Sequence, residues 1–180
     1  MMGKYPYLLS GHFKQGYIKT YTQELATENL LLFKSITDKY DLRYWLSFGT
    51  LLGVYRDGEL ISYDCDIDIS IRYDDAENFV KADPELLENG FEPIRMDKNY
   101  PLISWGRKGQ YIDLYGFYKV SDCEYRLASY KLESEQVENL SVINFKGVDF
   151  QAPLDIEKYL VRYYGDTWQT PIVGKPAKGD

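Results

Sequence analysis

The 180-residue sequence predicts an α+β domain in which a mixed β-sheet is flanked by helices. Two observations carry this prediction: helical and strand patterns alternate along residues 20–90, and mostly strand patterns follow them. The chain length is typical of one domain, since domains usually contain roughly 100–200 residues. We therefore expect residues 1–180 to form one domain, with an irregular N-terminal arm at 1–19 and a polar tail at 170–180.

The first predicted helix covers residues 20–40. Its apolar side chains recur at helical spacing, and they are Leu25, Leu32, Phe33, Ile36 and Tyr40. Thr20 with Gln23 resembles a capping box at its start. After it, residues 43–47 indicate a short strand, and residues 50–57 indicate a short helix that Gly58 ends.

Residues 66–72 alternate strictly between isoleucine and mostly polar side chains, which is typical of a strand. This alternation places Asp66 and Asp68 on one face of the strand. A helix is expected at 74–82, followed by a helical turn that begins near Pro84.

The second half of the chain carries mainly strand patterns. We expect strands at 91–95, 102–107, 110–118 and 125–130, with a hairpin turn at Lys108-Gly109. Residues 142–150 are interpreted as a hairpin that turns at Lys146-Gly147. A last helix is expected at 154–164, between Pro153 and Gly165.

Composition excludes several classes of function. The formal net charge of −7 argues against a protein that binds a nucleic acid polymer, because such a protein needs a basic surface. With His12 as the single histidine, a histidine-rich zinc site cannot form. Cys65 and Cys123 are too few for a disulfide framework. No apolar run is long enough for a transmembrane segment, so we expect a soluble, cytoplasmic protein.

Gly49 and Thr50 stand between a predicted strand and a predicted helix. A glycine there allows a ligand to approach the backbone, and the N–H groups at a helix start favour an anion. The Thr50 hydroxyl adds a hydrogen-bond donor. These two residues are therefore candidate contacts for a phosphate group.

The acidic segment that follows contains Asp64, Asp66 and Asp68. On a strand, residues two apart lie about 7 Å apart on one face, so Asp66 and Asp68 can reach the same cation. Several carboxylates in one place are unfavourable unless a cation or a proton neutralises them. Oxygen ligands suit Mg²⁺ or Mn²⁺, which makes Asp66 and Asp68 candidate metal ligands.

Asp113 lies on a later predicted strand between aliphatic residues. If that strand neighbours the one at 66–72, Asp113 completes a cluster of three carboxylates. Such a cluster supports metal-assisted phosphoryl transfer, in which Asp113 activates the attacking hydroxyl or binds a second metal.

Three segments together resemble the LicD/fukutin family. The first, SFGTLLGVYRDGELISYDCDIDISI, matches the family's G-T-L-L-G element, its arginine and its acidic run. The matching residues there are Gly49, Thr50, Leu51, Leu52, Gly53, Arg56, Asp64, Asp66 and Asp68. YIDLYGF resembles the family's second acidic strand, and EKYLVRYYGDTWQTP resembles its closing pattern. Tyr63 and Cys65 stand where Trp and Asp are common in the family.

The resemblance implies a nucleotidyltransferase-like fold with catalytic carboxylates Asp66, Asp68 and Asp113. It also implies transfer of a phospho-alcohol, such as phosphocholine or an alditol phosphate, from a CDP-linked donor to a glycan acceptor. Mg²⁺ or Mn²⁺ would be the cofactor, and Gly49, Thr50 and Arg56 would bind the substrate.

Two other functions remain open from the sequence. One is a nucleotidyltransferase that uses a nucleoside triphosphate, and the other is an inactive module of the same fold that binds a glycan or a nucleotide. Single residues also have structural alternatives: Asp113 can pair with an arginine, and Arg56 can pair with Asp57 or Glu59.

Overall fold

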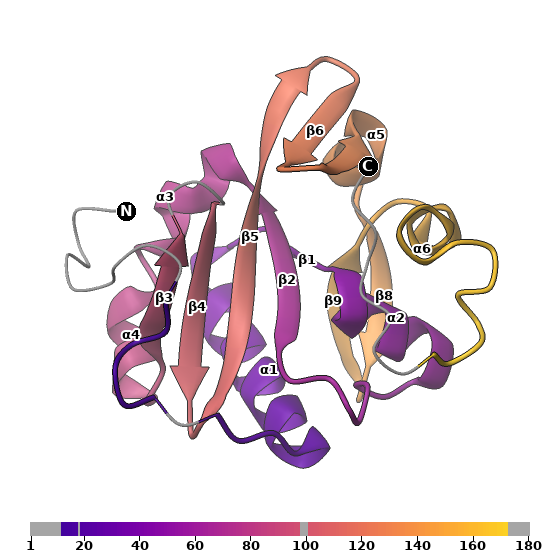
Figure 1. Ribbon diagram of the computed structural model, residues 1–180. Coiled ribbons are helices and arrows are strands. Elements are labelled where there is room, and N and C mark those ends of the chain that lie inside the picture. Colours follow the sequence, from indigo (N-terminus) through magenta and orange to yellow (C-terminus); the bar gives the residue numbers. More distant parts are fainter. Residues whose placement is uncertain (1–11, 18, 98–100, 173–180) are drawn as a thin grey trace.

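A seven-stranded mixed sheet forms the centre of the computed structural model, which describes residues 12–17, 19–97 and 101–172 (Figure 1). Five strands follow the order β1-β2-β5-β4-β3, and β6 and β7 extend the sheet from β5. These strands are β1 (Trp45–Leu46), β2 (Ile67–Arg72), β3 (Glu92–Asp97), β4 (Leu102–Arg107), β5 (Gln110–Ser121), β6 (Glu124–Leu127) and β7 (Tyr130–Glu133). Because β2 and β5 are parallel and the other pairs antiparallel, the predicted mixed sheet is confirmed.

Helices and a second hairpin surround this sheet. The helices are α1 (Gln23–Thr37), α2 (Phe48–Asp57), α3 (Ala76–Phe79), α4 (Asp83–Glu88), α5 (Ser134–Glu138) and α6 (Ile156–Tyr164), with 3₁₀ turns at Asp38–Tyr40 and Tyr73–Asp75. The hairpin consists of β8 (Ser141–Phe145) and β9 (Val148–Ala152). Figure 1 shows α1 behind the sheet, whereas α2, α6 and the hairpin lie together beside β2.

The helix α1 begins later than the sequence predicts. Thr22, not Thr20, is its N-cap: the Thr22 side chain accepts a 3.2 Å hydrogen bond from the Leu25 N–H. The buried face of the helix includes Leu30, Phe33 and Ile36, so the prediction identified the apolar stripe only in part.

The helix α2 begins two residues earlier than predicted, at Phe48. Gly49 and Thr50 therefore lie in its first turn rather than before it. Its end is as predicted, because Gly58 has the left-handed φ of 68° that ends a helix.

The parallel pair β2–β5 forms the middle of the core. Ile67, Ile69 and Ile71 are at most 2% exposed, and Ile69 lies opposite Leu114 of β5. Since successive side chains on a strand face opposite ways, this apolar face leaves the other face to Asp68 and Asp113.

Several boundaries in the second half differ from the predictions. The strand expected at 125–130 is divided between β6 and β7, which pair as a hairpin, and α5 was not predicted. The hairpin turn at Lys146-Gly147 is confirmed, with positive φ at both residues. Among the described residues, no helix combines the length and the hydrophobicity needed to cross a membrane.

The described part of the N-terminal arm, residues 12–17 and 19, contains no helix or strand and lies against the sheet. The Lys14 N–H donates to the Ile94 carbonyl, and the Tyr17 hydroxyl donates to the Gln110 carbonyl. The tail expected at 170–180 lies outside the described residues from 173 onward, as do arm residues 1–11 and 18.

Candidate functional site

A row of polar side chains crosses four neighbouring strands on the face opposite the isoleucines. Asp68 of β2 is the register partner of Asp113 on β5. Asp113 in turn pairs with Ser104 of β4, and Ser104 pairs with Arg95 of β3. The expectation that the strand of Asp113 neighbours the acidic strand is therefore confirmed. The fold brings together two carboxylates that are far apart in the sequence.

Asp64 and Asp66 extend this row at the start of β2. The side-chain ligand atoms of Asp64, Cys65 and Asp66 all lie within 4.8 Å of one another. The Tyr111 hydroxyl of β5 donates a 3.4 Å hydrogen bond to Asp66 Oδ2. The cluster thus contains four carboxylates, those of Asp64, Asp66, Asp68 and Asp113, with one thiol at its exposed side.

The start of α2 is tied to Asp68 by two hydrogen bonds. The Gly49 N–H donates to Asp68 Oδ2 over 3.0 Å, and the Asp68 N–H donates to Thr50 Oγ1 over 2.8 Å. A Cβ atom on Gly49 would overlap Asp64 Oδ2 and lie 3.3 Å from Asp68 Oδ2. The glycine therefore leaves room for the Asp64 carboxylate in its present position beside Asp68. In this structure both predicted phosphate contacts, Gly49 and Thr50, position Asp68.

The residue before Gly49 is held in an unusual conformation. Phe48 has a φ of 41°, which is strained for a bulky side chain. Its N–H donates to the Tyr159 hydroxyl over 3.1 Å, and its ring packs against Tyr130 at 5.0 Å between centroids. Strain of this kind persists only where the surroundings enforce it, and here it directs the Gly49 N–H toward Asp68.

Burial and mutual repulsion raise the pKa values of the acidic groups. Burial comes first for Asp68, followed by the charges of Asp66, Asp64 and Asp113, and together they hold its pKa well above the ordinary value. For Asp66, burial and the neighbouring Asp64 raise the pKa to about 7. At neutral pH the cluster therefore favours either protons or a cation.

Asp113 is surrounded by hydrogen-bond donors. Arg95 Nη2 and Tyr115 OH donate to its Oδ2, and Ser104 Oγ donates to its Oδ1. Burial raises its pKa, while the positive charge of Arg95 opposes that effect. Arg95, Ser104 and the Tyr115 contact were not predicted, although the pairing of Asp113 with an arginine was an open alternative.

Arg56 lies apart from this row, in the last turn of α2. Its guanidinium forms two hydrogen bonds with Asp57, at 2.9 and 2.7 Å, and one of 3.5 Å with the Trp168 carbonyl. The structural alternative, a pair with Asp57, is therefore present. Contact between Arg56 and a substrate stays a prediction.

Tyrosine side chains surround the carboxylates. The sequence contains 18 tyrosines, but its pattern did not show which of them lie at the cluster. Tyr164 is nearly buried, and its pKa is raised by burial and then by Asp68 and Asp64. The pKa of Tyr130 is raised by burial and then by the charge of Asp68. Tyr164 lies on α6 and Tyr130 on β7, while Tyr111 and Tyr115, which donate to Asp66 and Asp113, lie on β5. Only the folded chain brings these rings to the cluster.

The oxygen donors of this cluster fit Mg²⁺ or Mn²⁺. Asp68 is 7% exposed and is surrounded by other carboxylates, so a hard cation would remove a large repulsion. Asp66 and Asp68 offer oxygens from one strand face, and Asp64 lies within reach of Asp66. Cys65 adds a softer atom that these two ions do not prefer.

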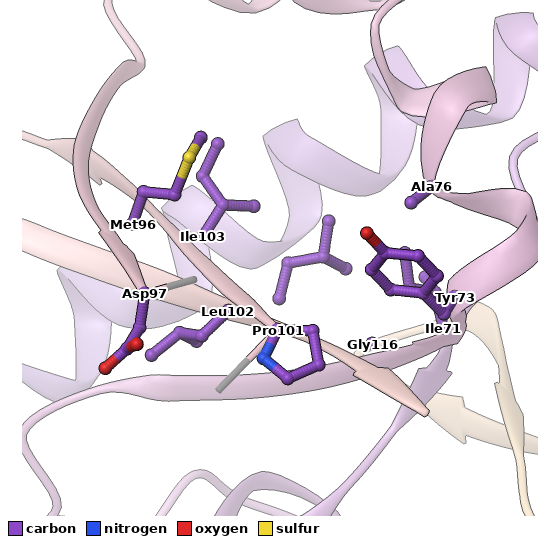
Figure 2. Close-up of a pocket in the computed structure, with 10 residues that line it drawn as sticks. Ile71, Tyr73, Ala76, Met96, Asp97, Pro101, Leu102, Ile103 and Gly116 are labelled. Carbon is purple, nitrogen blue, oxygen red and sulfur yellow. The ribbon is translucent and has the colours of Figure 1, made fainter. Parts of the chain in front are cut away.

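A pocket elsewhere in the molecule is unrelated to these groups. It has a volume of about 60 Å³, and its lining includes Ile71, Ile103 and Leu114. Figure 2 shows its mostly apolar lining, with Tyr73 and Asp97 among the labelled residues. It lies at the C-terminal end of β2, whereas Asp66 directly precedes that strand and Asp68 lies near its start.

The mixed sheet, the glycine at a helix start and the carboxylates on neighbouring strands define a protein of the nucleotidyltransferase-fold class. The fold is similar to that of the lincosamide antibiotic adenylyltransferase LnuA, solved with lincomycin bound. The TM-score is 0.55 and the identity 17%, over 77% of this chain and 85% of that chain. For the structure of ANT(2")-Ia in complex with adenylyl-2"-tobramycin, the TM-score is 0.50 and the identity 15%, over 71% of this chain and 69% of that chain. These likenesses concern the fold alone.

The chain belongs to the LicD/FKTN/FKRP family, because the nucleotidyltransferase-domain model of that family matches residues 41–155. Ribitol-5-phosphate transferase FKTN of Homo sapiens is 25% identical over 159 residues, covering 82% of this chain and 34% of that protein. The uncharacterized protein RT0683 of Rickettsia typhi is 30% identical over 101 residues, covering 56% of this chain and 28% of that protein. The chain thus spans about a third of the length of these curated relatives. The resemblance stated from the sequence is confirmed.

Proposed function

We propose that this chain is a metal-dependent transferase that moves a phospho-alcohol from a CDP-activated donor to a glycan hydroxyl. The observation that carries the proposal is the convergence of Asp66, Asp68 and Asp113 beside Gly49. Family membership supports the reaction class, and the name of the human relative favours an alditol phosphate as the transferred group.

In this proposal Asp66 and Asp68 hold Mg²⁺ or Mn²⁺, which supplies charge neutralisation for the diphosphate of the donor. Gly49 and Thr50 keep Asp68 in position through their hydrogen bonds. The Thr50 hydroxyl still has its own proton to donate to a phosphate oxygen. Catalysis then depends mainly on positioning and on charge stabilisation.

Asp113 is the candidate group for the proton of the acceptor. A carboxylate offers about four acceptor positions, and the three donors around Asp113 leave one of them. The acceptor oxygen bonds to the phosphorus that carries the alcohol, and its proton passes to Asp113. The bond from that phosphorus to the bridging oxygen breaks, and CMP leaves with the electron pair.

The test is a donor screen with CDP-ribitol and CDP-choline in the presence of Mn²⁺ and candidate glycan acceptors. We expect release of CMP that EDTA abolishes and that Asp68→Asn lowers by about a hundredfold or more. Asp122→Asn, at an exposed position in the β5–β6 turn, is the matched control and should retain activity.

Other outcomes separate the alternatives. Release of pyrophosphate from a nucleoside triphosphate would identify a nucleotidyltransferase instead. If no donor turns over and Asp68→Asn leaves the affinity for CDP unchanged, the chain is a binding module without catalytic carboxylates.

A further inference from the structure

Arg95 ends the polar row and faces the acidic cluster with a positive charge. Its Nε donates to Ser104 Oγ over 2.9 Å, and its Nη2 donates to Asp113. Its side chain is 19% exposed, whereas that of Asp113 is 1% exposed. Asp113 therefore fixes Arg95 from the buried side and leaves part of the Arg95 side chain open to solvent.

The N-terminal arm adds a second cation at the same place. Lys19 Nζ lies 3.9 Å from the centre of the Phe13 ring and 5.2 Å from that of Tyr111. Arg95 Cζ lies 4.6 Å from the Phe13 ring and 5.9 Å from Tyr111. The two rings themselves pack edge to face at 5.1 Å. Two cations from different parts of the chain thus share one pair of aromatic rings.

The aromatic rings hold both cations without neutralising them, and Asp113 is an additional, anionic partner of Arg95. A cation–π contact attracts a cation to the ring but leaves its N–H groups available to an anion. Tyr111 links the two halves of the site, since its ring contacts both cations and its hydroxyl donates to Asp66. The cationic side therefore borders the carboxylates directly.

We propose that Arg95 and Lys19 form the anion-binding half of the site and bind the diphosphate of the nucleotide donor, opposite the carboxylates that bind the metal. This inference rests on the proposed function and names residues that the acidic motif does not include. A diphosphate carries more negative charge than one divalent ion neutralises. In a chain with a net charge of −7, additional cations at the cluster therefore favour its binding. Asp113, the group proposed to take the proton of the acceptor, also holds Arg95 in position.

The experiment measures two affinities for each variant. Mn²⁺ binding is measured without nucleotide by electron paramagnetic resonance, and binding of CDP and of inorganic pyrophosphate is measured calorimetrically with Mn²⁺ present. Lys19→Gln and Arg95→Gln are the test variants. Lys14→Gln on the same arm and Arg126→Gln on β6 are controls with the same charge change, and both native side chains form exposed ion pairs.

We expect Arg95→Gln to weaken CDP and pyrophosphate binding by roughly tenfold to a hundredfold, the range of one lost charge-assisted hydrogen bond. Lys19→Gln should weaken both by roughly three- to tenfold. Mn²⁺ binding should stay unchanged or tighten, because a positive charge near the carboxylates is removed. Arg95→Lys should recover part of the lost affinity. A residue with only a structural role would not separate the two affinities in this way.

The inference is overturned if both test variants bind CDP and pyrophosphate as the wild type does, or if Mn²⁺ affinity falls in parallel with them. It is also overturned if the wild type binds neither probe. Because Arg95→Gln leaves a buried carboxylate without its partner, the exposed Lys19→Gln decides the matter if Arg95→Gln fails to fold. Binding of pyrophosphate but not of CDP would contradict the CDP donor alone, and the variants then decide on pyrophosphate.

Discussion

Asp68 and Asp113 lie side by side on the parallel strands β2 and β5, and both are nearly buried. Two carboxylates in such a place repel each other unless a proton, a cation or a donor compensates them. Asp113 has Arg95 as its compensating cation, whereas Asp68 has the Gly49 N–H. We therefore expect the stability of this part of the fold to depend on pH and on divalent cations.

The free energy of unfolding of the metal-free protein should fall as the pH rises from about 4 to about 7. Burial and Asp64 raise the pKa of Asp66 from 3.8 to about 7, and that of Asp68 is also raised. In this window the folded state retains protons that the unfolded state releases. Each such group can therefore cost up to about 1.4 kcal/mol per pH unit. The stability that such a group provides in its protonated form is fully present below the unfolded-state pKa. It is lost as the pH rises through the folded-state pKa.

Urea unfolding across this pH range checks the prediction. Asp66→Asn should reduce the slope, Mn²⁺ should reduce it in the wild type, and Asp122→Asn should leave it unchanged. A stability that rises steadily with pH would contradict the repulsion inferred for the cluster.

Gly49→Ala and Gly53→Ala should have different effects although both glycines lie in α2. A Cβ at Gly49 meets the side chain of Asp64, which can move away from its place in the cluster. A Cβ at Gly53 lies 2.6 Å from the backbone oxygen of Glu59, which cannot move without a shift of the chain. Gly53→Ala should therefore lose about 1–3 kcal/mol of stability. Gly49→Ala should mainly weaken Mn²⁺ binding. Equal losses of Mn²⁺ affinity in the two variants would contradict this distinction.

Tyr159→Phe should destabilise the start of α2. The Tyr159 hydroxyl accepts the hydrogen bond of the buried Phe48 N–H, and its loss leaves that donor unsatisfied. We expect the free energy of unfolding to fall by about 1–3 kcal/mol in chemical denaturation. We also expect weaker Mn²⁺ binding, because Phe48 directly precedes Gly49, whose N–H holds Asp68. Tyr55→Phe is the control, since the Tyr55 hydroxyl pairs with Glu157 at an exposed position. A Tyr159→Phe protein as stable as Tyr55→Phe would show that the contact is dispensable.

Cys65→Asp should tighten Mn²⁺ binding by roughly three- to tenfold, because it adds a hard ligand close to Asp64 and Asp66. The same variant should be less stable than the wild type without metal, since it adds a negative charge to the cluster. Cys65→Ser is the matched control and should change neither property greatly. Mn²⁺ titration and thermal unfolding measure both effects. Identical Mn²⁺ affinities for Cys65→Asp and Cys65→Ser would place Cys65 outside the coordination shell.

The sequence by itself predicted the mixed sheet, the strand that carries Asp68, the hairpin at Lys146-Gly147 and the family. These features follow from local patterns: alternation on strands, turn residues at fixed places and a contiguous acidic motif. The helix predicted from the sequence began two residues after the start of α2. The positive φ of Phe48 depends on Tyr159 and on the aromatic rings packed around Phe48, which no local pattern indicates.

Only the tertiary structure decided which residues surround the acidic motif. Asp113 was a candidate on its own strand, but its place beside Asp68 required the parallel pairing of β2 with β5. Arg95, Ser104 and Lys19 have no local signal, since each occupies a position that is ordinary for its strand or arm. Contacts between side chains of distant segments depend on strand register and on packing against the sheet. Neither is encoded in the few residues around each position.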